Sequence, residues 1–102
     1  MAFAIVKTGT WLYGGRVETP VDIIALDYDW WYSLAEADGQ LEPGERPMTP
    51  GPDGCIYYVR FREALKHSEP VWPDSHGHAT VSEAMKYAES KVVGGIKWHN
   101  AT

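Results

Sequence analysis

The densest group of side chains that could do chemistry lies in residues 74–78, Asp-Ser-His-Gly-His. Residues two apart on an extended chain point to the same side, so His76 and His78 could share a divalent metal ion. Two imidazoles do not make a site, and a third ligand would have to come from Asp74, His67 or His99. No Cys-x-x-Cys pair accompanies them, so the alternative is a solvated loop whose histidines bind no metal.

Two other groups have the side chains that catalysis uses. Cys55 could act as a thiolate nucleophile beside a histidine, but a cysteine that opens an apolar strand is more often a small buried side chain. Asp27 and Asp29, two apart on a strand, would lie about 6–7 Å from each other, within the range of acid and base pairs. Solvated aspartates beside arginines explain the same pattern.

Aromatic residues are unusually frequent, with five Trp and six Tyr in 102 residues. One sheet face cannot bury all of these rings, so we expect some at an edge or on an opposite face, where Trp and Tyr bind partners well. The alternative is a second small core beneath two proline-containing loops, closed by Trp72. The expected recognition residues are Asp27, Asp29, Trp31, Tyr58, Arg60 and Trp72.

The elements that position these residues follow from hydrophobic patterning. From residue 24 to residue 34, large apolar side chains alternate with smaller or acidic ones, which predicts a strand. This strand would place Asp27, Asp29 and Trp31 together on the face opposite the aromatic ladder. Residues 55–62 predict another strand, on which Arg60 would meet Asp27 or Asp29 across the sheet.

The remaining chain predicts a hairpin, a long loop, one helix and a last strand. Gly14 and Gly15 are suited to a tight turn or a bulge after the first extended segment. Residues 40–54 contain four prolines and form the loop. Thr80 and Glu83 form a capping box for an amphipathic helix of about thirteen residues that ends near Gly94 and Gly95. Residues 96–98 predict an edge strand.

Composition limits the classes of function. With 9 Lys and Arg against 14 Asp and Glu, the net charge is −5, and the basic residues are scattered, which disfavours nucleic acid as a partner. We find no apolar run long enough to cross a membrane and no export signal. The single cysteine cannot form an internal disulfide, which favours the cytoplasm.

We therefore expect one α+β domain over residues 1–102. Its sheet would have four to five mainly antiparallel strands, with one helix from the C-terminal half on one face, in the order strand-strand-strand-strand-helix-strand. Such a chain without a catalytic motif is best interpreted as a cytoplasmic binding or assembly module without a cofactor. Its partner would be another protein, a second copy in a homodimer, or a small planar ligand.

Two alternatives remain from the sequence. One is a small metal-dependent or hydrolytic enzyme that uses His76, His78 and Asp74. The other is an acidic inhibitor that imitates nucleic acid and blocks a basic protein, which requires carboxylates clustered on one face.

Overall fold

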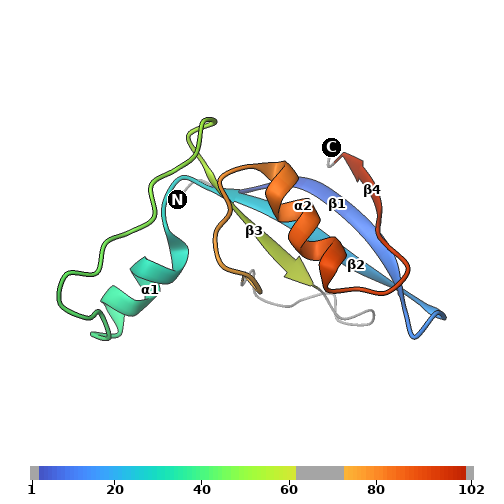
Figure 1. Cartoon of the computed structure of the whole chain (residues 1–102), viewed down its shortest axis with the longest axis horizontal. Coiled ribbons are helices and arrows are strands. Elements are labelled where there is room, and N and C mark those ends of the chain that lie inside the picture. The colour runs from blue at the N-terminus through green and yellow to red at the C-terminus, as the bar shows by residue number, and fades with distance from the viewer. Residues whose placement is uncertain (1–2, 62–72, 101–102) are drawn as a thin grey trace.

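The computed structural model describes residues 3–61 and 73–100. In chain order the elements are β1 (Phe3–Tyr13), β2 (Val17–Leu26), α1 (Trp30–Ala37), β3 (Ile56–Phe61), α2 (Val81–Ser90) and β4 (Lys97–Asn100). The four strands form one antiparallel sheet in the order β3-β2-β1-β4 (Figure 1). The α+β class, the antiparallel sheet and the helix in the C-terminal half are confirmed, while the order of elements differs because α1 lies between β2 and β3.

The expected strand over residues 24–34 is wrong after its first three residues. β2 ends at Leu26, and a helix begins at Trp30. The reason is Asp29, whose side chain accepts a hydrogen bond from the Tyr32 backbone N–H at 3.0 Å and so caps the first turn. The alternation is correct through Leu26, after which the cap outweighs the preference of aromatic residues for strands.

The first two strands form the hairpin that the glycine pair predicts. Gly14 and Gly15 have φ angles of 61° and 72°, in the left-handed region that glycine adopts at little cost. The Arg16 N–H closes the turn on the Tyr13 carbonyl at 3.1 Å. Tyr13 and Val17 are consequently direct cross-strand neighbours at the hairpin end.

Helix α2 covers one face of the sheet over β2 and β3 (Figure 1). The predicted cap forms: the Thr80 hydroxyl accepts from the Glu83 N–H at 3.1 Å, and the Glu83 carboxylate accepts the N–H of Ala79, the residue before the cap, at 3.1 Å. Ala84 and Ala88 are fully buried against Ile23 and Val59, and these small side chains let the helix approach the strands closely. The helix has ten residues rather than about thirteen.

A second hydrophobic cluster lies on the other sheet face. It joins Ile24, Leu26, Ile56 and Tyr58 to the half-buried Tyr28, Trp30 and Met48. The loop over residues 40–54 therefore contributes Met48 to a core, although we expect no deep packing from it. One of the two proline-containing loops thus contributes to a second core, while Trp72, which that alternative expects to close it, lies outside the described residues.

The outer edge of β3 is covered by residues 74–78. Tyr57 and His78 exchange two backbone hydrogen bonds of 2.8 Å. The Val59 carbonyl accepts the Asp74 N–H at 2.8 Å, and the Val59 N–H donates to the Ser75 hydroxyl at 2.9 Å. This segment satisfies the backbone groups that an edge strand would otherwise expose.

No helix among the described residues is long and apolar enough to span a membrane.

Candidate functional site

The two predicted recognition aspartates do not share a strand face. Asp27 is exposed just after β2, whereas Asp29 is half-buried at the start of α1. Besides capping the helix, the Asp29 carboxylate accepts the Met48 N–H at 2.7 Å. Asp29 therefore connects α1 to the following loop, and its geometry is that of a structural carboxylate.

Tyr58 and Arg60 lie inside the protein. The Tyr58 hydroxyl accepts the Trp30 N–H at 2.9 Å, and burial raises the pKa of Tyr58 to about 12. Arg60 donates its Nε–H to Asp22 at 3.2 Å and forms a buried ion pair with it. The expected partner, Asp27 or Asp29, is thus replaced by Asp22, which lies directly opposite Arg60 in the register of β2 and β3.

Trp31, one of the predicted recognition residues, is 41% exposed. Its indole N–H donates to the Ser75 carbonyl at 2.7 Å, and its ring meets Trp30 edge to face at a centroid separation of 4.7 Å. These contacts connect α1 to the segment that covers β3. Trp72 lies outside the described residues, as do His67 and Arg62.

The predicted histidine pair is brought together, but without the expected carboxylate. The ring centroids of His76 and His78 are 4.6 Å apart. Asp74 turns toward β3 instead, where its carboxylate accepts the Phe61 N–H at 2.6 Å. Within residues 3–61 and 73–100, no three His, Cys, Asp or Glu side chains are grouped to hold a metal ion.

His78 has the more enclosed ring of the pair. It packs on Tyr87 of α2 at a centroid separation of 5.1 Å, and its Nε2 is buried without a hydrogen-bond partner among the described residues. Burial lowers the pKa of His78, and the nearby His76 lowers it further, while Glu83 acts in the opposite direction. His78 is therefore favoured as a neutral ring.

Cys55 is half-buried beside the core under α2. The half-buried side chains packed against the same cluster also include Val81 and Met85. This position matches the expectation of a small core side chain.

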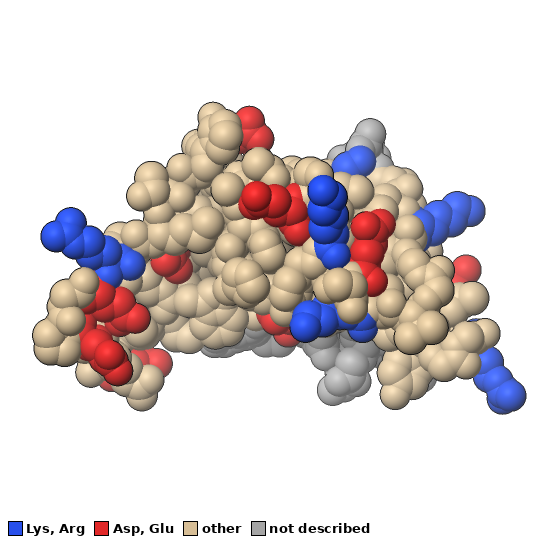
Figure 2. Space-filling view, viewed as in Figure 1, with Lys and Arg blue, Asp and Glu red and all other residues tan. Residues whose placement is uncertain are grey.

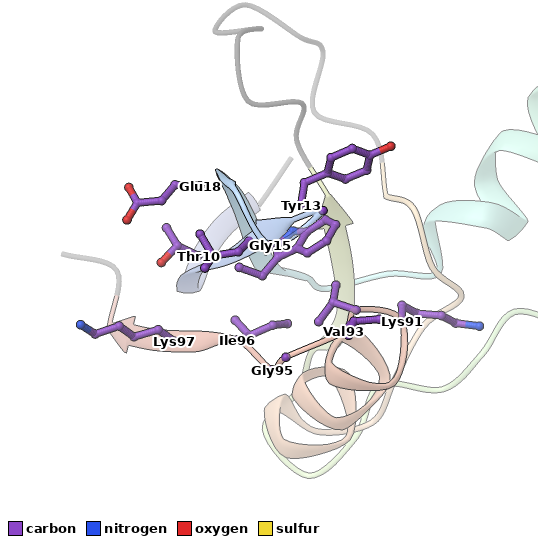
Figure 3. Close-up of a pocket in the computed structure, with 14 residues that line it drawn as sticks. Thr10, Tyr13, Gly15, Glu18, Lys91, Val93, Gly95, Ile96 and Lys97 are labelled. Carbon is purple, nitrogen blue, oxygen red and sulfur yellow. The ribbon is translucent and has the colours of Figure 1, made fainter.

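A hollow of about 910 Å³ at the hairpin end is a site that we do not predict from the sequence. It is lined by residues 10–15 and Glu18 of the β1–β2 hairpin and by residues 91–97, which connect α2 to β4. Figure 3 shows side chains of the hairpin, among them Tyr13, on one side and Val93 on the other. We call this feature the hairpin-end hollow.

The hollow is surrounded by exposed apolar side chains. Tyr13 is 66% exposed and Val93 is 90% exposed, and Leu12 and Val17 are about half exposed beside them. At its base, Trp11 contacts Tyr13 and Phe61 edge to face, with centroids 5.8 and 6.5 Å apart. These contacts connect the exposed apolar surface to the core under α2.

Charged groups around the hollow are mainly basic. Lys91 and Lys97 are exposed in its lining, with Glu18 as the one acid of that lining. The Lys91 ammonium lies 5.1 Å from the centre of the Tyr87 ring, a cation–π contact that holds it at the end of α2. The lining offers no nucleophile beside a base, so its geometry suits binding.

One sequence pattern could have indicated this site: large apolar residues stand directly beside glycine pairs. Leu12 and Tyr13 precede Gly14 and Gly15, and Val93 precedes Gly94 and Gly95. Turn-forming segments are commonly polar, so large apolar side chains there are informative. The sequence does not indicate that the two turns meet, because about eighty residues separate them.

Comparisons with protein-family models, with curated proteins and with solved structures found no match to this chain. The evidence for function is therefore the geometry and chemistry of the hollow and of the histidine pair.

Proposed function

We propose that the protein is a non-catalytic binding module that recognises a protein surface through the hairpin-end hollow. The observation that carries this proposal is the exposure of Tyr13 and Val93 on facing sides of one hollow. A contiguous exposed apolar patch on a small protein is typical of a site that a partner covers. In this proposal the hairpin-end hollow replaces Asp29, Tyr58 and Arg60 as the recognition site, because the side chains of these three residues have partners within the fold.

The energetics favour a partner with an apolar anchor. Covering a Val side chain is worth about 1.5–3 kcal/mol, and a buried tyrosine ring contributes area on the same scale. The two lysines of the lining, Lys91 and Lys97, outnumber its one acid, Glu18, and favour acidic groups around that anchor. We place this activity in the cytoplasm, since the chain has one cysteine and hence no internal disulfide.

Site-specific photo-crosslinking tests the proposal. A photoreactive phenylalanine analogue replaces Val93 in one variant and Lys86, an exposed residue of α2, in a control variant. In the cells that make the protein, we expect an adduct of defined mass from position 93 and none from position 86. Adding Tyr13→Ala to the position-93 variant should remove the adduct. Equal labelling from both positions, or no adduct from position 93, would contradict the proposal.

A second candidate function is the binding of a divalent transition metal by His76 and His78. The adjacency of their rings, with centroids 4.6 Å apart, favours it. Metal analysis of untagged protein, with a His76→Ala variant as control, tests this candidate. Stoichiometric zinc that the variant loses would support it, and no uptake of added zinc would end it.

A further inference from the structure

The two ends of the molecule differ in charge. Helix α1 and the residues that follow it, here called the α1 arm (residues 30–46), carry exposed carboxylates at Glu36, Asp38, Glu42 and Glu45 against one base, Arg46. Figure 2 shows red atoms grouped at this end of the molecule, where a blue side chain also projects, and blue side chains extending from the opposite end. The carboxylates of the α1 arm are therefore grouped, whereas acidic and basic side chains are interspersed over the middle of the face that Figure 2 shows.

The α1 arm is only partly covered by the rest of the chain. Trp30 packs against the second hydrophobic cluster, but none of the eight residues of α1 is fully buried, Trp31 is 41% exposed, and Tyr32 and Leu34 are half-buried. Figure 1 shows α1 extending away from the sheet and from α2. An amphipathic helix gains most of its stability from packing its apolar face, so this arm has apolar surface left for a contact.

The hairpin-end hollow has the complementary properties. It presents exposed Tyr13 and Val93 within a rim that holds Lys91 and Lys97. An apolar helix with an acidic end would meet an apolar hollow with a basic rim, and such complementarity favours the correct orientation on encounter.

The two surfaces lie at opposite ends of an elongated molecule. Its longest dimension is 46 Å against 28 and 24 Å, and Figure 1 places α1 at one end and the β1–β2 hairpin at the other. One chain therefore cannot bring its own α1 arm to its own hollow while it keeps this fold. A second copy can.

Building on the proposed function, we infer that the hairpin-end hollow of one copy binds the α1 arm of a second copy. The carboxylates of the arm then face the lysines of the rim, and Tyr13 and Val93 cover the apolar side of the arm. This contact is head to tail, because each copy uses a different surface on each side. It produces an open chain of copies, or a ring where the rotation closes, rather than a symmetric dimer.

Two variants separate the surfaces. Val93→Asp places a charge in the hollow, at a side chain exposed enough that folding should not depend on it. Glu36→Lys with Glu42→Lys reverses the charge of the arm at two exposed positions. The matched controls are Ser82→Asp on α2 and Asp27→Lys before α1, because both residues are exposed and lie outside the two surfaces.

Sedimentation velocity over a concentration series gives the readout. We expect the unaltered protein to form species larger than a dimer, and to dissociate at about 0.5 M salt, where charges are screened within a few ångströms. Each surface variant should weaken association by about tenfold or more, while both controls associate normally. Circular dichroism checks that every variant is folded.

Mixing the two surface variants provides the decisive measurement. The Val93→Asp protein keeps an intact arm and the lysine variant keeps an intact hollow, so the mixture should form a one-to-one dimer and nothing larger. A mixture that stays monomeric, an arm variant that associates normally, or a monomeric unaltered protein at all concentrations would overturn the inference. If the photoreactive residue at position 93 forms its adduct with a different protein, the proposed function is supported. The α1 arm of a second copy is then refuted as the occupant of the hollow.

Discussion

Asp29 accepts the backbone N–H of Met48 across 2.7 Å, and this bond joins the first turn of α1 to the loop over residues 40–54. The other oxygen of the same carboxylate accepts the Tyr32 N–H at 3.0 Å. Asp29 therefore satisfies two backbone donors and joins α1 to a loop whose sequence shows no periodic apolar pattern.

Asp29→Ala should lower the free energy of unfolding by about 2 kcal/mol, because it removes a helix cap and a second hydrogen bond. Asp27→Ala is the matched control, since Asp27 is exposed beyond the end of β2, and should change stability by about 0.5 kcal/mol or less. Urea unfolding of both variants measures the difference. Equal effects of the two substitutions would contradict the capping role.

Asp22→Ala should destabilise the protein far more than a surface substitution, by about 3–5 kcal/mol, because Arg60 is left as a buried charge. Asp22 and Arg60 are 1% and 8% exposed, and the Thr8 hydroxyl also donates to Asp22 at 3.0 Å. For a domain of this size the loss approaches the total stability, which is about 5–15 kcal/mol.

The double variant Asp22→Leu with Arg60→Met keeps this prediction measurable if the single variant does not fold. Two apolar side chains replace the ion pair, so we expect most of the lost stability to return. Thermal and urea unfolding compare the three proteins. A double variant as unstable as Asp22→Ala would mean that the cost does not come from the unpaired arginine.

The parts of the fold that the sequence predicts are those with local causes. The hairpin follows from two adjacent glycines, and the start of α2 follows from Thr80 and Glu83 within one turn. The side-chain parity of β3 is also local, and Tyr57 and Val59 face α2 as the alternation indicates.

The wrong predictions have two causes. One is competition between two local signals, and the other is pairing between residues that lie far apart in the sequence. At residues 27–34 an N-cap aspartate and an aromatic alternation favour different structures, and the cap prevails. Arg60 pairs with Asp22, 38 residues away, because the β2–β3 register places them opposite each other. The alternation of residues 55–62 predicts the face of β3 on which Arg60 lies. It does not predict which neighbouring strand supplies the acidic partner of Arg60.

Thr80→Ala should lower the free energy of unfolding by about 1 kcal/mol, because the Glu83 N–H loses the hydroxyl that caps it. Ser82→Ala is the control on the same turn, since Ser82 is exposed and alanine has the higher helix propensity. We expect this control to be neutral or slightly stabilising in urea unfolding. If both alanine variants lose the same stability, the capping box does not contribute.

Acid should weaken the packing of residues 74–78 against β3 through His78. Burial lowers the pKa of His78 below its ordinary 6.5 in the folded protein, so the unfolded chain binds the proton more readily. The stability that His78 contributes is complete above pH 6.5. It is lost as the pH falls from that value through the lower folded pKa. The charged and titratable groups around His78 are His76 and Glu83, with Tyr87 packed on the ring and Lys91 over Tyr87.

His78→Phe tests this dependence because it keeps a ring on Tyr87 and removes the ionisable nitrogens. Urea unfolding at about pH 7.5 and about pH 5.5 spans the range in which a histidine titrates. We expect the unaltered protein and a His99→Gln control, whose side chain is exposed, to lose stability between these values. The His78→Phe protein should lose less, and hydrogen exchange at the Tyr57 and His78 amides should show the same difference. Identical pH dependence in all three proteins would show that another group controls the acid response.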